Sequence, residues 1–255
     1  MKIIKKNLNS KVVKFVLIIC VIFMVAGASL GMAAYKGKII LNHPSNKDYP
    51  VRGVDVSAYQ GEIDWDVLEK QEIDFAFVKA TEGSSFVDRR FIQNYEEARK
   101  TDLRIGAYHF FSFDSSGKTQ AENFIKNVPV DDEMLPPVVD FEFYGDKEKN
   151  LPDKEEARQE LRVLLKMLTQ EYGKKPVIYS TMKAYNRYIA GDFREYDIWI
   201  RDVLRKPSLK DKRDWTFWQY TSREVLKGYH GDEKFIDMNV FHGTKSEFQA
   251  YGNAS

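Results

Sequence analysis

The sequence predicts an α/β protein that consists of a closed barrel of eight strands preceded by one apolar helix. Eight short runs of β-branched and aromatic residues lie between turn residues, as buried parallel strands do. Amphipathic stretches separate the first five runs, whereas only loops or short turns separate the last three. This alternation is typical of a (β/α) barrel whose final third lacks full helices.

An open, doubly wound sheet is the alternative architecture for the same alternation of strands and helices. Nucleotide-binding versions of that sheet carry a GxGxxG turn after the first strand or a GxxxxGK[ST] loop, and the sequence has neither. The closed barrel is therefore the favoured interpretation, and the open sheet remains the alternative.

Residues 1–35 form the first predicted region, a cytoplasmic stub with a membrane anchor or signal peptide. They contain five lysines and no acid, and residues 15–35 are 21 uncharged residues in a row. A helix of that length spans the roughly 30 Å hydrocarbon layer of a bilayer. Because all five lysines of this region lie on the amino-terminal side of the uncharged stretch, we expect the rest of the chain outside the cytoplasm. The alternative is a secreted protein released by cleavage near Ala28, since Ala26-Gly27-Ala28 offers small residues.

The polar segment 36–50 contains two prolines and is predicted to be a short stalk, which leaves 51–255 as the catalytic barrel. Residues 36–255 hold 34 basic and 38 acidic side chains. This slightly negative net charge does not attract the phosphate backbone of a nucleic acid. Cys20 is the only cysteine, so the exported part has no disulfide. The histidines show no metal-binding spacing, and we expect a monomer without metal or cofactor.

The predicted strands are, in order, 51–57, 75–81, 104–111, 136–142, 176–181, 196–200, 215–221 and 235–241. The clearest helix covers 153–172, where leucines recur with the period of a helix. Pro152 is expected to start this helix, and Gly173 and Pro176 to end it. Weaker helical patterns occupy 64–72, 88–101 and 117–127.

A pair of acids in one buried strand is the sharpest chemical feature. Asp140 and Glu142 lie two residues apart in a run of valines and phenylalanine, so their side chains point the same way. Two carboxylates in one interior repel each other, and burial adds to the effect, so one pKa should rise. An acid beside an ionised partner suits acid-assisted cleavage of a glycosidic bond.

Asp55 and Asp237 are also acids within apolar strands, near the ends at which a barrel carries its functional side chains. Lys79 and Glu82 could pair with each other or contact a substrate. Aromatic residues occupy the same strand ends, and we expect about half of them to contact sugar rings and the others to pack. They are Tyr59, Tyr108, Phe110, Phe111, Tyr179, Trp199, Trp218 and Tyr220, of which Tyr59, Tyr108, Tyr179, Trp199 and Trp218 are the candidates for sugar binding.

These residues form a set that resembles the glycoside hydrolase family 25 lysozymes over about 51–243. The matching segments are Asp55-Val-Ser-Ala-Tyr59-Gln60-Gly61, Phe77-Val-Lys79-Ala-Thr81-Glu82-Gly83, Gly106-Ala-Tyr108-His109-Phe110, Asp140-Phe-Glu142, Trp218-Gln219-Tyr220 and Asp237-Met-Asn239. The resemblance implies a TIM-like (β/α)5β3 barrel and an N-acetylmuramidase that acts on peptidoglycan.

The resemblance also implies a role for each acid. Glu142 would protonate the leaving oxygen, and Asp140 would orient the substrate's 2-acetamido group, which attacks the anomeric carbon with overall retention. Asp55 and Asp237 would hold the substrate and keep the electrostatic potential negative around the cationic transition state. Gln219 would bind sugar together with the aromatic residues.

Three rival functions remain, one of which is a scaffold whose main function is the membrane anchor. A barrel chitinase would add acids upstream of the pair, where this chain has Pro136 and Val138, and a sugar-binding module with a dead site would have lost one of the four acids.

Overall fold

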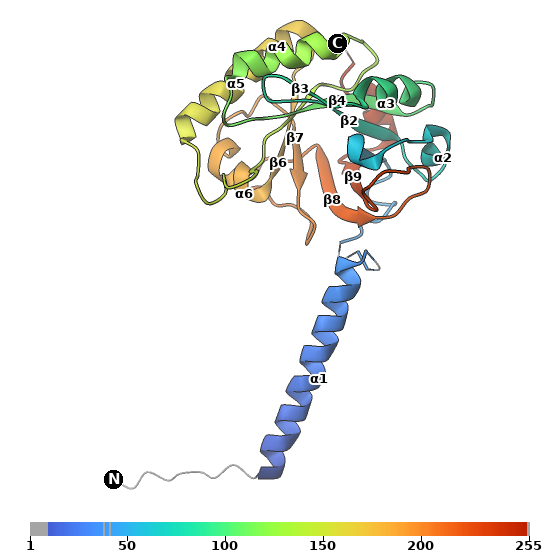
Figure 1. The fold of residues 1–255 in the computed structure, drawn as a ribbon, viewed down its shortest axis with the longest axis vertical. Helices are drawn as coiled ribbons and strands as arrows, with labels where there is room; N and C mark the ends of the chain where they lie inside the picture. The colour runs from blue at the N-terminus through green and yellow to red at the C-terminus, as the bar shows by residue number, and fades with distance from the viewer. Residues whose placement is uncertain (1–9, 38, 41, 254–255) are drawn as a thin grey trace. The chain divides into compact units, whose positions relative to one another are not determined.

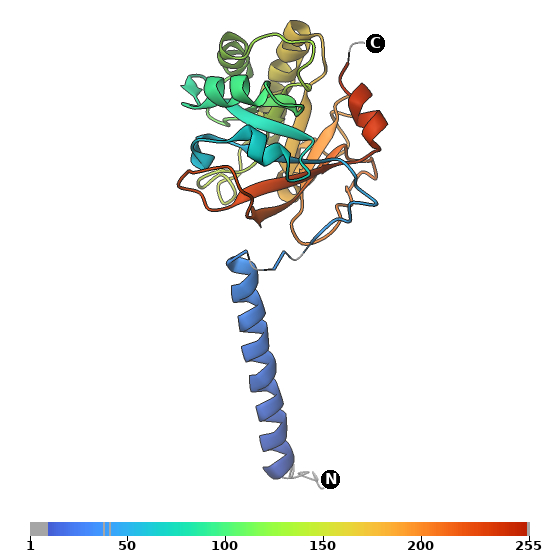
Figure 2. The ribbon, with the colours of Figure 1, turned by 90° about the vertical axis from the view of Figure 1, so that its right-hand side faces the viewer.

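The computed structural model describes residues 10–37, 39–40 and 42–253, which belong to two compact units. The first unit ends at Ile40 and contains one helix, α1 (Ser10–Tyr35; Figures 1 and 2). Its span Val12–Tyr35 has a mean hydropathy of 2.6 and is long and apolar enough to cross a membrane. A signal sequence near an amino terminus has the same properties, so this helix agrees with both sequence interpretations.

The second unit, from residue 41 onward, contains the other helices and all the strands in the described part of the chain. Its strands are β1 (Arg52–Val56), β2 (Phe75–Glu82), β3 (Phe86–Val87), β4 (Arg104–Phe110), β5 (Val138–Asp140), β6 (Val177–Thr181), β7 (Ile198–Arg201), β8 (Phe217–Glu224) and β9 (Ile236–Phe241). Its helices are η1 (Ala58–Gln60), α2 (Trp65–Glu69), α3 (Phe91–Ala98), α4 (Gly117–Asn127), α5 (Lys154–Tyr172), α6 (Met182–Ala184), η2 (Tyr185–Ile189) and α7 (Lys245–Ala250).

The strands close into a barrel, so the open-sheet alternative is wrong. The strand order is β1-β9-β8-β7-β6-β5-β4-β2-β3, and β1 also pairs with β2, which joins the two ends of the sheet. Neighbouring strands from β1 through β8 run parallel, apart from the short hairpin strand β3, whereas β9 is antiparallel to both β8 and β1. Each of the eight predicted runs overlaps one barrel strand, and β3 is the additional strand.

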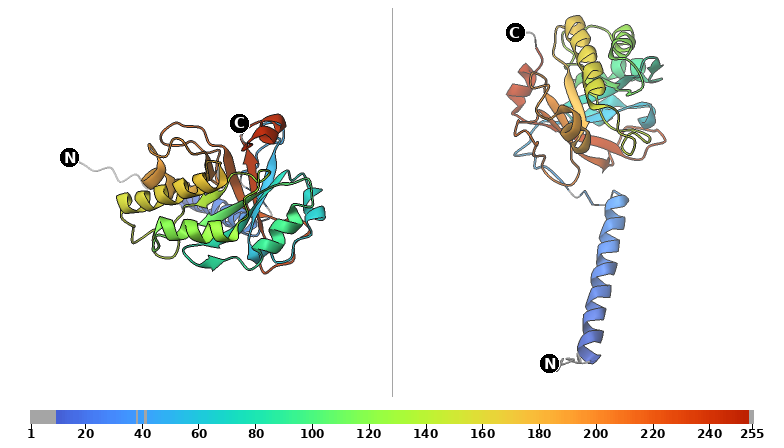
Figure 3. Two further views of the ribbon diagram at one scale, coloured as in Figure 1. Left: turned by 90° about the horizontal axis from the view of Figure 1, so that it is seen from above. Right: turned by 90° about the vertical axis from the view of Figure 1, so that its left-hand side faces the viewer.

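The helices cover the outside of the barrel. Helices α4 and α5 lie side by side against it (Figure 3). Helix α5 begins one residue later than expected because Asp153, rather than Pro152, caps its first turn by accepting from the backbone N–H groups of Glu155 and Glu156. It ends at Gly173, whose φ of 64° is left-handed, as predicted.

The helical turns at 182–189, which follow β6, were not predicted from the sequence. They bury Tyr185, Tyr188 and Ile189, whose spacing is helical but covers only one turn. A stripe that short cannot be told from a loop by periodicity alone.

The barrel has two apolar layers, one between strands and helices and one inside the barrel. The inner layer fills the barrel end opposite to the pocket described below, and its centre is formed by Phe75, Phe77 and Phe217. Glycines face these rings, because a Cβ on Gly53 would lie 2.4 Å from the Phe75 ring and one on Gly106 would lie 2.5 Å from the Phe77 ring. Small strand residues thus make room for the phenylalanines that close this end of the barrel.

Part of the expected stalk packs on the barrel. Asn42 donates to the carbonyl oxygen of Asp202 at 3.4 Å, and Tyr49, which is only 8% exposed, packs against Trp215 and Trp218. This segment is drawn in blue in Figure 2. The compact unit therefore begins near residue 41 and not at residue 51.

We expect Gly106→Ala to destabilise the protein by about 1–3 kcal/mol, because the added methyl group overpacks a ring that strands hold on all sides. Thermal or urea unfolding measures this loss. The matched controls are Phe77→Leu and the double variant, in which the smaller side chain removes the obstructing ring atoms. Losses that simply add in the double variant would contradict the proposed contact between Gly106 and Phe77.

Candidate active site

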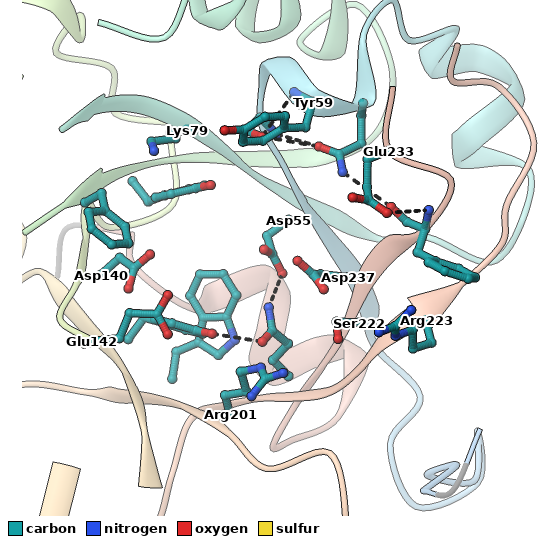
Figure 4. A pocket seen from close by; sticks show the side chains of 18 residues that line it. Asp55, Tyr59, Lys79, Asp140, Glu142, Arg201, Ser222, Arg223, Glu233 and Asp237 are labelled. Carbon is teal, nitrogen blue, oxygen red and sulfur yellow. Dashed lines mark hydrogen bonds between the residues drawn. The ribbon is translucent and has the colours of Figure 1, made fainter. Parts of the chain in front are cut away.

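A pocket of about 590 Å³ lies at the carboxyl ends of the barrel strands. Every second residue of a strand faces the barrel interior, and the last such residue of each strand reaches the pocket. Figure 4 shows the acids gathered there from strands that are far apart in the sequence. The strand residues that line the pocket are Asp55, Lys79, Tyr108, Phe110, Asp140, Tyr179, Trp199, Arg201, Gln219, Ser222, Arg223 and Asp237, and Glu142 follows β5.

Asp55 is fixed by two side-chain amides. Its Oδ2 accepts from Gln219 Nε2 at 2.9 Å and from Asn239 Nδ2 at 2.8 Å. Two aromatic residues orient those amides in turn. Tyr179 OH donates to Gln219 Oε1 at 2.9 Å, and Trp199 Nε1 donates to Asn239 Oδ1 at 2.8 Å. Both amides therefore direct their NH₂ groups at Asp55, which fixes the carboxyl group without a cation in contact.

Asp237 faces Asp55 across the antiparallel pair of β9 and β1, where the two residues are register partners. Burial, the charge of Asp55 and a hydrogen bond to Asp55 raise the pKa of Asp237 well above its usual range. Burial also raises the pKa of Asp55, although the donors Asn239 and Gln219 oppose this effect. The two acids therefore share a proton, which resides on Asp237.

Asp140 and Glu142 face the pocket together, while Phe141 between them is fully buried on the other side of the strand. Burial, followed by the charge of Glu142, raises the pKa of Asp140 well above its usual range. Burial raises the pKa of Glu142 as well, and the charge of Arg201 limits that rise. Burial therefore raises the pKa of both acids, and the two titrate as a pair. The Oδ1 of Asp140 is buried and has no hydrogen-bond partner in the described part of the chain.

The expected sugar-binding residues lie in different surroundings. Tyr59 is 69% exposed at the mouth of the pocket, and Tyr108 lines its wall. Tyr179 and Trp199 also line the pocket, but they are only 6% and 2% exposed, and their polar atoms hold the amides described above. Gln219 therefore acts on Asp55, and its own exposure is 3%.

Trp218 lies outside the pocket, contrary to the sequence expectation. It is on the outer face of β8, where its ring packs against Tyr49, Trp215 and Tyr220 and its Nε1 donates to the carbonyl oxygen of Asp202. Successive strand residues face opposite ways, so Gln219 on the inside requires Trp218 on the outside. We no longer propose a contact between Trp218 and substrate.

Several pocket residues were not identified from the sequence as candidates for the site. Arg201 follows Trp199 by two residues in β7, and this spacing is a signal that could have found it. Arg223 lies near the end of β8, and Glu233 and Phe235 come from the connection of β8 and β9, which extends the pocket wall and has no periodic pattern.

His109 is a buried structural residue, as the sequence suggested. Its Nδ1 is 2.7 Å from Thr81 Oγ1 and its Nε2 is 3.0 Å from Gln120 Oε1. Burial lowers its pKa to about 4, so the ring is neutral at ordinary pH. Among the described residues, no three His, Cys, Asp or Glu side chains are arranged to hold a metal ion.

An eight-stranded α/β barrel with two pairs of carboxyl groups and a wall of tyrosines at its carboxyl end defines a barrel glycosidase. Residues 54–229 match the model of the family described as Glycosyl hydrolases family 25, and the chain belongs to this family. The protein is therefore a glycosidase of the lysozyme type.

Relatives and solved structures agree with this membership. The structure of a family 25 glycosyl hydrolase from Bacillus anthracis superposes with a TM-score of 0.79 at 56% identity, covering 83% of this chain and 97% of that one. A bacterial lysozyme from Streptomyces coelicolor superposes with a TM-score of 0.70 at 30% identity over 80% of this chain and 97% of that one. Lysozyme M1 of Streptomyces globisporus is 30% identical over 223 residues, which is 80% of this chain and 71% of that protein.

Proposed function

We propose that the protein cleaves the β-1,4 bond between N-acetylmuramic acid and N-acetylglucosamine in peptidoglycan, outside the cytoplasm. The observation that carries this proposal is the pair Asp140 and Glu142 at the end of β5, in a pocket of the family 25 barrel. The relatives named as lysozymes support this choice of substrate. All four acids face the pocket, which disfavours a sugar-binding module with a dead site.

The reaction proceeds with retention and in two steps. In the first, the acetamido oxygen of the muramic acid attacks C1, the bond from C1 to the bridging oxygen breaks, and Glu142 gives that oxygen a proton. In the second, Glu142 takes a proton from a water molecule, which attacks C1 and opens the oxazolinium ring. The unpartnered Oδ1 of Asp140 is suited to accept a hydrogen bond from the acetamido N–H.

The fold assignment that goes with this function is a (β/α)5β3 barrel. Helical segments follow β1, the β2–β3 hairpin, β4, β5 and β6, whereas the connections from β7 to β8 and from β8 to β9 contain no helix among the described residues. This arrangement supports five βα units followed by three strands.

The proposed function is tested by digesting purified peptidoglycan with the full chain in detergent micelles and reducing the new ends with borohydride. Mass spectrometry should find muramitol at the new ends. The control is Glu142→Gln, which should release none. Glucosaminitol ends, or faster cleavage of chitin oligosaccharides than of peptidoglycan, would contradict the muramidase assignment and favour a chitinase. Retention is tested by NMR, which should detect the β-anomer first.

We expect Asp55→Asn to lower turnover by about 10²–10³-fold while the fold stays intact. Asparagine keeps an oxygen that can accept from Gln219 and Asn239, but it removes the negative charge that stabilises the developing cation at C1. Asp237→Asn is the matched variant, and it should lower turnover less, because Asp237 holds the proton that the two acids share and so contributes less negative charge. Initial rates and melting temperatures measured together check this, and early melting without a specific loss of rate would indicate structural carboxyl groups instead.

We propose that α1 remains as an uncleaved membrane anchor. A reporter fused after Ser255 should be active outside the cytoplasm, and the protein should remain in the membrane fraction, because five lysines precede the uncharged stretch 15–35 and only Lys36 and Lys38 follow it closely. Recovery of a soluble product that begins near Ser29 would show that the segment is a signal peptide.

A further inference from the structure

Arg201 is a cation in the pocket wall whose guanidinium contacts no polar group of the described residues. It ends β7, between its register partners Thr181 on β6 and Gln219 on β8, so a rigid sheet holds its backbone. Its side chain is partly buried and lines the pocket. Within the described part of the chain, its guanidinium makes no hydrogen bond, ion pair or ring contact.

The other cations of the pocket wall are engaged. Lys79 Nζ lies 2.7 Å from Glu82 Oε2 and 5.0 Å from the centre of the Phe110 ring. Arg223 lies over the Phe235 ring, with its Cζ 5.0 Å from the ring centre. Figure 4 shows Lys79 and Arg201 on opposite sides of the acids. Arg201 is thus the pocket cation whose donors are available to a ligand.

The chemistry of a guanidinium defines what that ligand offers. Arginine presents five N–H donors in a planar fork, which matches the two oxygens of a carboxylate. A partly buried polar group without a hydrogen-bond partner costs free energy. A substrate group that supplies acceptors to the guanidinium removes this cost, and the interaction therefore favours binding. The nearby acids do not supply them, although the charge of Arg201 favours the ionised forms of Glu142 and Asp237 from a distance.

We propose that Arg201 binds a carboxylate of the substrate and thereby selects muramic acid glycans over neutral chitin-like glycans. This inference rests on the proposed function and adds a specificity residue to it. Two groups of peptidoglycan supply a carboxylate near the sugar chain: the lactyl group of a muramic acid without a peptide, and the stem peptide of one that carries it. The proposed position of this carboxylate is beside Arg201, below the acids in the view of Figure 4.

The acids of the pocket do not prevent the approach of a carboxylate. Asp55 and Asp237 share a proton, and burial with mutual repulsion favours a shared proton on Asp140 and Glu142 as well. Lys79 and Glu82 form an ion pair. The pocket therefore carries fewer negative charges than its acids suggest, and Arg201 offsets part of the remainder.

The test compares the full chain with Arg201→Gln in steady-state kinetics on three substrates. These are a peptide-free muramyl oligosaccharide, the same oligosaccharide with its lactyl carboxylates converted to methyl amides, and an oligosaccharide with stem peptides. We expect Arg201→Gln to raise KM about 10–100-fold, with kcat nearly unchanged, on substrates that present the carboxylate. On the amide-capped oligosaccharide the variant should equal the unmodified protein.

Matched variants separate binding from other effects. Arg201→Lys keeps the positive charge but loses the planar pair of N–H donors, so its KM should lie between those of the unmodified protein and Arg201→Gln. Arg205→Gln makes the same charge change at a side chain that is 84% exposed and outside the pocket lining, and should leave KM unchanged. An effect only on the substrate with stem peptides supports the proposal and identifies the peptide as the source of the carboxylate.

Equal losses of Arg201→Gln on the capped and uncapped oligosaccharides, or a shift of the pH profile alone, would overturn the proposal, because Arg201 would then act through the charges of the acids. If Arg201→Gln does not fold, Arg201→Lys carries the test. Its KM on the substrate with a carboxylate should stay above that of the unmodified protein, and an equal KM would contradict the proposal. Cleavage of the capped oligosaccharide by the unmodified protein tests the proposed function separately, since that substrate has no carboxylate.

Discussion

Replacing Glu142 with glutamine is expected to lower peptidoglycan cleavage by about 10²–10⁴-fold, the usual contribution of a general acid. Glutamine keeps the size of the side chain and its place in the pocket, but it has no proton to give to the leaving oxygen. A sugar alkoxide is a poor leaving group, so the natural substrate depends on that proton.

A substrate that needs little acid assistance supplies the control. An aryl glycoside of the muramyl sugar, if the pocket accepts it, should retain a larger share of its rate in Glu142→Gln, because the aryl oxide leaves without a proton. The measurement is the ratio of kcat/KM for the two substrates. If the variant loses both rates in equal proportion, Glu142 does not act as the acid.

Replacing Asp140 with asparagine is expected to lower the rates on both substrates by about 10²–10³-fold. The acetamido group must be oriented and polarised whichever group leaves, so an activated leaving group should not rescue this variant. The side chain of asparagine has the same shape, and its amide offers one acceptor, so the loss reports the missing charge. Rescue by the aryl glycoside would contradict this division of roles.

The same variant should be more stable than the natural protein at neutral pH. Burial raises the pKa of Asp140 well above its ordinary value of 3.8, so the folded protein binds a proton more tightly than the unfolded chain does. Stability is then greatest at a pH below the ordinary value of 3.8 and is lost as the pH rises from there through the raised pKa. Asparagine has no charge to bury, and a gain of about 0.5–2 kcal/mol is typical when such a functional group is removed.

Melting temperatures across a pH series check this expectation. The difference between Asp140→Asn and the natural protein should grow as the pH rises from acid to neutral. A constant difference, or a variant that melts earlier at neutral pH, would show that Asp140 stabilises the barrel in its ionised form. The raised pKa values of Asp55, Glu142 and Asp237 contribute in the same direction, so the natural protein itself should also lose stability as the pH rises.

Much of the fold could be predicted because its signals are local. The leucine stripe of α5 and its ending at Gly173 are properties of neighbouring residues, and so are the eight runs that became barrel strands. The helical turns at 182–189 and the hairpin strand β3 were too short to produce a periodic signal. The packing of Asn42 and Tyr49 on the barrel depends on partners more than 150 residues away, which a local pattern does not contain.

The sequence by itself determined which side chains share a face, since the period of a strand requires Asp140 and Glu142 to point together and Trp218 and Gln219 to point apart. Only the tertiary structure decided which face is the inner one. That choice depends on the closure of the barrel by β1 with β9, which makes Asp55 and Asp237 register partners. The same closure places Trp218 outside and leaves Arg201 inside, with no hydrogen bond to another described residue. Strand periodicity is a property of one segment, whereas inside and outside exist only once distant segments have paired.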